Sequence, residues 1–266
     1  VALHNEFNTN LKCLNLSGTR VLGSNIGAEP NRAAQHVVRM LENNTTLTEL
    51  DLNHTRGIEK RVAADLKDVV VGNHHKYVGN PEKKKGREQY KVVQPHPSLQ
   101  TFNLIPLRGL PEGSNGELKL GDKGIGFVGA LVLSELIPTS TTITSLHLNG
   151  TLLSLAGIKA IIDSLEKNTS VTELNFSGAV FDNRAGRHLV NSLETKTLRT
   201  LTKLDVTNNP MTPEMRVKLS KAWTQLHGDE EGLITTESVI SVQKQPSRLS
   251  AAGAPRQEQD RRPSLR

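Results

Sequence analysis

The chain has 266 residues, a net charge of +6, 35% apolar residues and only 3% aromatic residues, so its core must be aliphatic. No run of 18 apolar residues is present to cross a membrane, and the first residues lack the basic and apolar segments of a signal peptide. The single cysteine, Cys13, excludes an internal disulfide. We therefore expect a soluble protein of the cytoplasm, with the nucleus as an alternative compartment.

One nine-residue phrase recurs along the chain, with apolar residues at its first, fourth and sixth positions. Clear copies are LKCLNLSGT from Leu11, LTELDLNHT from Leu47, ITSLHLNGT from Ile143, VTELNFSGA from Val171 and LTKLDVTNN from Leu201. Two copies, LQTFNLIPL from Leu99 and NGELKLGDK from Asn115, are degenerate. Alternation of this kind predicts a short strand that is buried on one face, so we expect seven strands. The undisturbed period, seen from position 115 to 143 and from 143 to 171, is 28 residues.

Apolar residues at helical spacing lie between most of the phrases. In the clearest segment, Ile158, Ile161 and Ile162 form one stripe, while Lys159 and Asp163 fall on the opposite side. Helices are predicted over residues 33–41, 63–71, 128–137, 156–165, 184–193 and 213–223. A polar Asn-Thr pair recurs before the phrases, and we expect its side chains to bond the loop backbone.

This strand phrase and period resemble the leucine-rich-repeat family, and the helix-bearing repeat is similar to its ribonuclease-inhibitor-like subclass. The resemblance covers Leu3 to Leu226. It implies an α/β solenoid, a horseshoe with parallel strands on the concave face and helices on the convex face. The asparagine that usually follows the strand core is present only at Asn209. Other residues replace it, and we therefore expect an irregular horseshoe: Thr19, Thr55, Leu107, Lys123, Thr151 and Ala179.

The predicted repeat domain spans residues 1–226, with a basic insertion at 72–98 and a glycine-rich loop at 109–116. Residues 227–266 are predicted to be a basic, flexible extension. Because residues 6–10 resemble the tails of later repeats, we expect the chain to open within a longer array. Its first repeat would then be a place where another repeat or a partner docks.

One column of polar residues is predicted to point outward from the concave sheet, because side chains alternate between the two faces of a strand. The column, a candidate partner-binding surface, consists of Asn15, Asp51, Asn103, Lys119, His147, Asn175 and Asp205. Glu49, Glu117, Glu173 and Lys203 flank it. The face is polar and has no aromatic residue, so a merely solvated face is the alternative to a polar partner surface.

The insertion concentrates positive charge outside the repeats. Between His74 and Lys91 it has six cations against two glutamates, a net charge of +4, and the cations are Lys76, Lys83, Lys84, Lys85, Arg87 and Lys91. The runs KYV and YKVV flank the turn-forming GNPEKKKG and predict a hairpin. The insertion could be a tolerated, solvated loop, could bind an acidic protein surface such as that of tubulin, or could bind RNA.

The C-terminal extension concentrates charge in the same way, with +4 over residues 243–266. Within it, RRPSL resembles the substrate motif of basophilic protein kinases, which makes Ser264 a candidate phosphosite. A phosphate there would remove local positive charge.

No group of residues predicts catalysis or the binding of a cofactor or a metal. Cys13 has no histidine in its motif, and His74 and His75 are adjacent, which is not the spacing of helical metal ligands. The glycines of GDKGIG follow a repeat strand and fit a repeat turn better than a nucleotide loop. We therefore expect a non-catalytic scaffold or adaptor in a larger assembly, with a cytoskeletal, axonemal or flagellar one as a candidate. RNA or ribonucleoprotein binding is the first alternative, and a regulator like Ran GTPase-activating proteins is the second.

Overall fold

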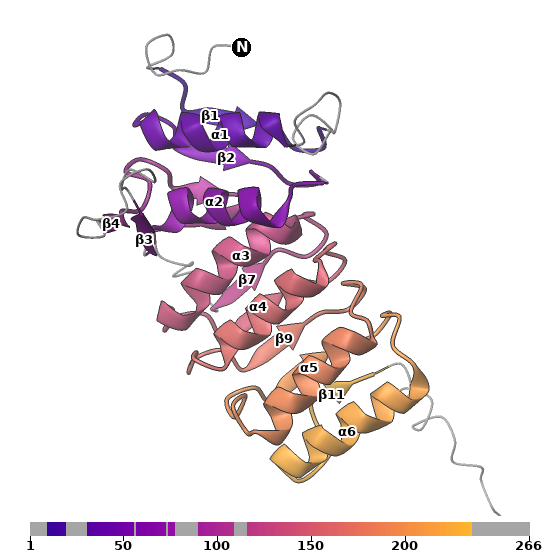
Figure 1. Ribbon diagram of the computed structural model, residues 1–266. Helices are drawn as coiled ribbons and strands as arrows, with labels where there is room; N and C mark the ends of the chain where they lie inside the picture. The colour runs from indigo at the N-terminus through magenta and orange to yellow at the C-terminus, as the bar shows by residue number, and fades with distance from the viewer. Residues whose placement is uncertain are drawn as a thin grey trace, which may run out of the picture.

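Strands and helices alternate along the chain, and the helices stack side by side in front of the strands (Figure 1). The computed structural model describes residues 10–19, 31–55, 57–72, 74–77, 90–108 and 116–235. Every predicted helix is present, and the observed bounds are α1 (Arg32–Asn43), α2 (Lys60–Val71), α3 (Gly126–Leu136), α4 (Leu155–Leu165), α5 (Asn183–Glu194) and α6 (Pro213–His227). A short 3-10 helix, η1 (Ile137–Thr139), continues α3.

The repeat strands form two sheets. The first contains β1 (Cys13–Asn15), β2 (Glu49–Asp51), β5 (Thr101–Phe102) and β6 (Ile105–Pro106), in that order. The second contains β7 (Glu117–Lys119), β8 (Ser145–His147), β9 (Glu173–Asn175), β10 (Lys203–Asp205) and β11 (Leu233–Ile234), all parallel. The central leucines of the phrases lie in one register, so Leu118, Leu146, Leu174 and Leu204 form a row.

The third repeat separates the two sheets. Asn103 and Leu104 have φ values of 50° and 65°, which are the values of a tight two-residue hairpin turn. The chain therefore reverses, and β6 pairs antiparallel with the edge of β5 that β7 would otherwise occupy. The sequence predicts a straight strand here with Leu104 inside. In the structure Leu104 is 51% exposed and Ile105 is fully buried, because the turn comes one residue after Phe102.

Contacts between turns and helices hold the two sheets together across this break. The backbone N–H of His54 donates to the carbonyl of Gly124 at 2.8 Å. On the helix side, Lys67 of α2 pairs with Glu135 of α3 at 2.9 Å. Among the described residues no helix lies between β6 and β7, and α2 packs directly against α3.

The core is a continuous aliphatic layer between sheets and helices, as the composition predicts. Its few rings are fully buried, including Phe102, Phe176, Phe181 and Trp223. The sheet also continues past Leu226, because Leu233 in β11 pairs with Leu204 and is buried. Among the described helices none is both long and apolar enough to span a membrane.

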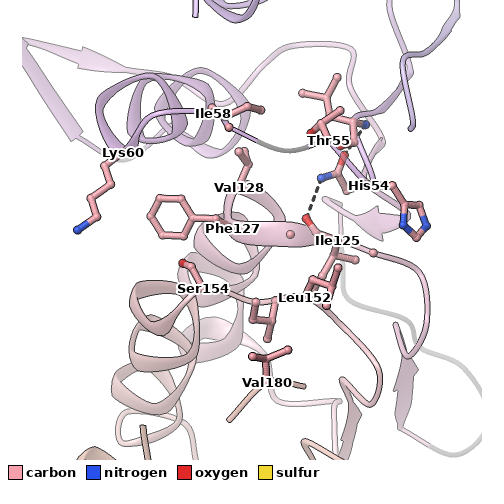
Figure 2. A pocket seen from close by; sticks show the side chains of 16 residues that line it. His54, Thr55, Ile58, Lys60, Ile125, Phe127, Val128, Leu152, Ser154 and Val180 are labelled. Carbon is pink, nitrogen blue, oxygen red and sulfur yellow. Dashed lines mark hydrogen bonds between the residues drawn. The ribbon is translucent and has the colours of Figure 1, made fainter. Parts of the chain in front are cut away.

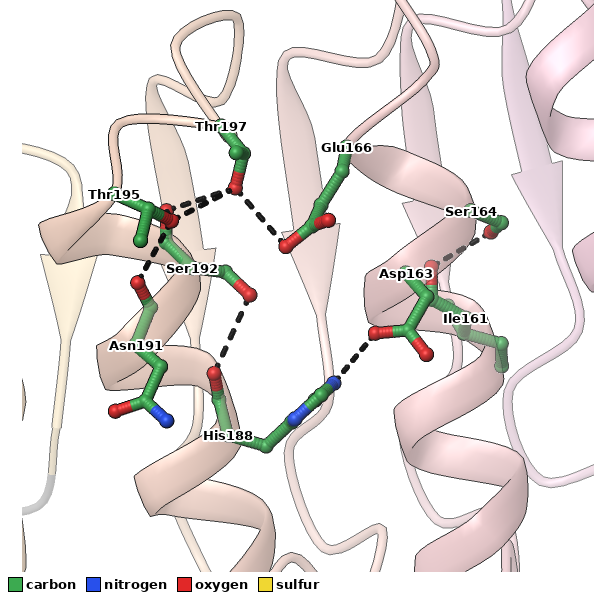
Figure 3. A network of polar contacts seen from close by, with 9 residues as sticks. All are labelled: Ile161, Asp163, Ser164, Glu166, His188, Asn191, Ser192, Thr195 and Thr197. Atoms are coloured by element: carbon green, nitrogen blue, oxygen red, sulfur yellow. Dashed lines mark hydrogen bonds and ion pairs between the residues drawn. The ribbon is translucent and has the colours of Figure 1, made fainter.

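Polar contacts on the outer surface join neighbouring helices. Nε2 of His188 on α5 lies 2.6 Å from Oδ1 of Asp163 on α4, and Figure 3 shows this contact as a dashed line. At the ends of the same helices, the Thr197 hydroxyl donates to Glu166 at 3.0 Å. The polar side chains on the side of α4 opposite Ile158 and Ile161 therefore face the solvent, as predicted, and they also link one repeat to the next.

The predicted hairpin of the insertion is present in the backbone. β3 (His74–Tyr77) pairs antiparallel with β4 (Tyr90–Val93), and Lys76 lies opposite Lys91. Lys83, Lys84, Lys85 and Arg87 lie outside the described residues, as do residues 109–115 of the glycine-rich loop and Ser264.

Candidate functional site

The first candidate surface is the side of the two sheets opposite the helices, which we call the open sheet face. Strand register places Lys119, His147, Asn175 and Asp205 in one row on the second sheet. On the first sheet Asn15 lies beside Asp51. The predicted column is therefore present in two separate groups.

Asn103, which the sequence places in this column, is not on the open sheet face. Its side chain is 1% exposed. Its Oδ1 accepts a hydrogen bond from the N–H of Leu52 at 2.7 Å, and its Nδ2 donates to the carbonyl of Ile125 at 3.3 Å. The hairpin turn rotates the residue out of the strand, and the amide instead connects the second repeat to the fourth.

Four members of the column also have a structural role that the sequence reasoning missed. The side-chain oxygens of Asn15, Asp51, Asn175 and Asp205 each accept a hydrogen bond from the backbone N–H two residues later. Such Asx turns end the strand and start the repeat loop. The recurrence of Asn or Asp at this position is the signal that could have revealed the role.

Ion pairs on the open sheet face leave its charges exposed. Glu117 and Lys119 are 2.6 Å apart, and Glu173 and Lys203 are 3.3 Å apart. The hydrogen bond from Lys119 holds the pKa of Glu117 below its usual value. Exposed pairs of this kind contribute little to stability, so their charges can serve recognition.

Cys13 lies at the first-sheet end of this face, opposite Glu49 in the strand register, and its thiol is exposed and free. Its hydrogen bond to Glu49 raises the pKa of the thiol, because the carboxylate stabilises the protonated form.

We expect alkylation of Cys13 by iodoacetamide to need a higher pH than alkylation of free cysteine. Glu49→Gln should shift the pH profile of the alkylation rate downward. Glu173→Gln on the other sheet is the control and should not shift it.

The second candidate site is an apolar pocket of about 570 Å³ beside the break between the sheets (Figure 2). Its walls come from the loops that follow the second, fourth, fifth and sixth repeat strands. Its polar lining residues are His54, Thr55, Lys60, Asn103 and Ser154. Its apolar lining includes Ile58, Ile125, Phe127, Val128, Leu152 and Val180.

The pocket was not predicted, although the phrases from Leu99 and Asn115 are degenerate and begin only 16 residues apart. One signal was available at the fifth position after each strand. That position is Arg in the first two repeats, Arg20 and Arg56, but becomes the apolar Leu152 and Val180 later. In the parts of the chain that are described, no group of three or more His, Cys, Asp or Glu side chains could hold a metal ion.

Comparison with known proteins gives a family match and likenesses to solved structures, among them the two described below. A family model described as a leucine-rich repeat matches residues 7–28, 43–60 and 197–214, which contain the phrases at Leu11, Leu47 and Leu201. The solved structure of leiomodin-1 actin-binding site 2 is similar, with 14% identity, 89% of this chain and 88% of that chain covered, and a TM-score of 0.32. The tropomodulin C-terminal domain of Caenorhabditis elegans is similar, with 12% identity, 90% and 94% coverage, and a TM-score of 0.30. No curated protein matches the chain in sequence.

Proposed function

We propose that this leucine-rich-repeat protein is a non-catalytic scaffold that binds other proteins through its open sheet face. In this proposal the array curves as a horseshoe, and the open sheet face is its concave side. The family match and the parallel strand register support the proposal. The ribonuclease-inhibitor-like subclass and a cytoskeletal or flagellar assembly remain predictions.

The observation that carries the proposal is the alignment of polar side chains across β7, β8, β9 and β10. Adjacent strands lie about 4.8 Å apart, so these side chains form a regular grid of donors, acceptors and charges. On this face acidic Glu117 pairs with basic Lys119, and acidic Glu173 pairs with basic Lys203. A surface of this kind provides specificity through electrostatic complementarity with a protein partner.

The test uses a photo-crosslinking side chain placed at Asn175 in the full chain, within the native cell. We expect protein partners to be captured from this position and not from Lys221, which is exposed on α6. The double variant Lys119→Glu with Lys203→Glu should reduce the yield about tenfold, because two favourable charge contacts are reversed. Lys218→Glu with Lys221→Glu makes the same charge change on a helix and is the matched control. Equal capture from both faces, or no loss in the first double variant, would contradict the proposal.

A second candidate function is binding of an acidic protein surface or RNA by the insertion. The register of β3 and β4, which places Lys76 opposite Lys91, is the observation that favours it. Removal of residues 79–87 separates the two functions. A partner of the open sheet face remains bound without this segment, whereas a partner held by Lys83, Lys84, Lys85 and Arg87 is lost. Binding through these residues would also fall steeply with added salt.

A further inference from the structure

The apolar pocket lies beside the start of α2 and the start of α3. α2 and α3 are neighbours in space, but the loops that enter them belong to repeats that are two apart in sequence. The Asn103 amide and the bond from His54 to Gly124 tie these two loops together at the pocket wall. These hydrogen bonds therefore fix the two loops relative to each other at the opening of the pocket.

Apolar side chains are left exposed at this opening. Leu152 is 53% exposed and Val180 is 50% exposed, and both line the pocket. Figure 2 shows Ile58 on the far side from these two residues, with Phe127 and Ile125 between them. Water contact with such a patch is unfavourable, and contiguous exposed apolar surface marks interaction sites.

Val180 also has an unusual backbone conformation, with a φ of 59°. A β-branched residue in this region is a genuine outlier, whereas Gly, Asn or Asp would be tolerated. The side chain is placed at the pocket despite the strain and without burial in the core.

The electrostatic environment of the pocket favours a negative group. No aspartate or glutamate lines it, and the exposed Lys60 does. The helices α2, α3 and α4 all begin at the lining, and none has an acidic residue in its first turn. Their N-terminal ends carry partial positive charge. Glu59 directly precedes α2 but is not part of the lining.

We propose that this pocket is a docking site for a partner protein, and that it takes an aliphatic or aromatic side chain with an adjacent carboxylate. The apolar side chain would contact Leu152, Val180 and Phe127, and the carboxylate would lie near Lys60. A small molecule fits less well. Small-molecule sites enclose most of the ligand surface, whereas the lining residues Leu152 and Val180 are about half exposed. The site is distinct from the open sheet face, so either proposal can fail without the other.

The experiment selects a phage-displayed library of random twelve-residue peptides against the full 266-residue chain. We expect enrichment of peptides that have Leu, Phe or Trp within two positions of Asp or Glu. The affinity of an enriched synthetic peptide is then measured by fluorescence anisotropy. Val180→Asp, whose side chain tolerates the backbone conformation, should weaken binding at least tenfold. Val217→Asp is the matched control, because Val217 is 46% exposed on α6, and it should change binding less than twofold.

Further variants test the charge and the fold. Leu152→Asp should weaken binding like Val180→Asp, and circular dichroism of each variant checks that the fold is kept. Lys60→Glu should weaken binding about fivefold and remove the preference for acidic peptides on reselection. The proposal is overturned if no peptide is enriched, if enriched peptides are basic, or if Val217→Asp is as harmful as Val180→Asp. It is also overturned if peptides bind only after residues 20–30 are replaced by a Gly-Ser linker, because the chain would then fill its own pocket.

Discussion

Asn209→Ala is expected to lower the free energy of unfolding by about 2 to 4 kcal/mol. The Asn209 side chain is buried, and its Nδ2 donates to the carbonyls of Phe176, Val206 and Thr207 at 2.8 to 3.1 Å. Its Oδ1 accepts from the N–H of Phe181 at 2.9 Å. Truncation leaves buried backbone groups of two adjacent repeats without partners. Urea denaturation followed by circular dichroism measures the loss.

Thr55→Ala is the control for Asn209→Ala, because Thr55 occupies the equivalent position in the second repeat. Among the described residues its hydroxyl donates to the carbonyl of Leu52, at 2.6 Å, and this contact stays within one repeat. We expect a loss of about 1 kcal/mol. Equal effects of the two variants would show that the bonds between repeats at Asn209 contribute nothing extra.

Gly72→Ala is expected to destabilise the protein by about 3 kcal/mol or more, because conformational strain and overlap act together. Gly72 ends α2 with φ 72° and ψ −144°, a combination open almost only to glycine. An added Cβ would lie 2.5 Å from the backbone nitrogen of Pro95 and 2.7 Å from the carbonyl carbon of Gln94. These backbone atoms cannot relieve the overlap by a change of rotamer, as side-chain atoms could. Thermal denaturation measures the effect as a lower melting temperature.

Gly18→Ala separates the two contributions to this effect. Gly18 has a φ of 69°, and an added Cβ would have no neighbour within 4 Å. Strain alone then costs about 1 to 2 kcal/mol. A loss for Gly72→Ala no greater than that for Gly18→Ala would show that the ends of the insertion separate easily.

The repeated phrase predicted the seven repeat strands, and apolar residues at helical spacing predicted the helices between them, because each repeat uses the same packing. The positive φ values of the repeat turns could also have been predicted. Gly18, His54, Asp122, Gly150, Gly178 and Asn208 stand at equivalent positions three residues after their strands, and all have positive φ. The substitution of threonine for asparagine was visible in sequence. Only the structure shows that Thr55 keeps the bond within its own repeat, whereas Asn209 also reaches the preceding repeat.

The third repeat could not be predicted, because its apolar positions fit either a straight strand or a hairpin. Phe102 and Ile105 are both buried, and a strand would have buried Phe102 and Leu104. The position of Asn103 depends on that choice, as does the pocket beside it. β11 escaped prediction because its two residues are too short to show a pattern.

The edge formed by β6 separates the repeat strands into two sheets, and each sheet with its helices forms one unit of the array. Within each unit, the unfolding of one strand affects the next strand through the backbone hydrogen bonds between them. Between the units, the described contacts include the packing of α2 against α3, the Asn103 amide and the bond from His54 to Gly124. In a repeat array, cooperativity depends on the interface between neighbours. The strength of this one junction therefore determines whether the chain melts as one body or as two.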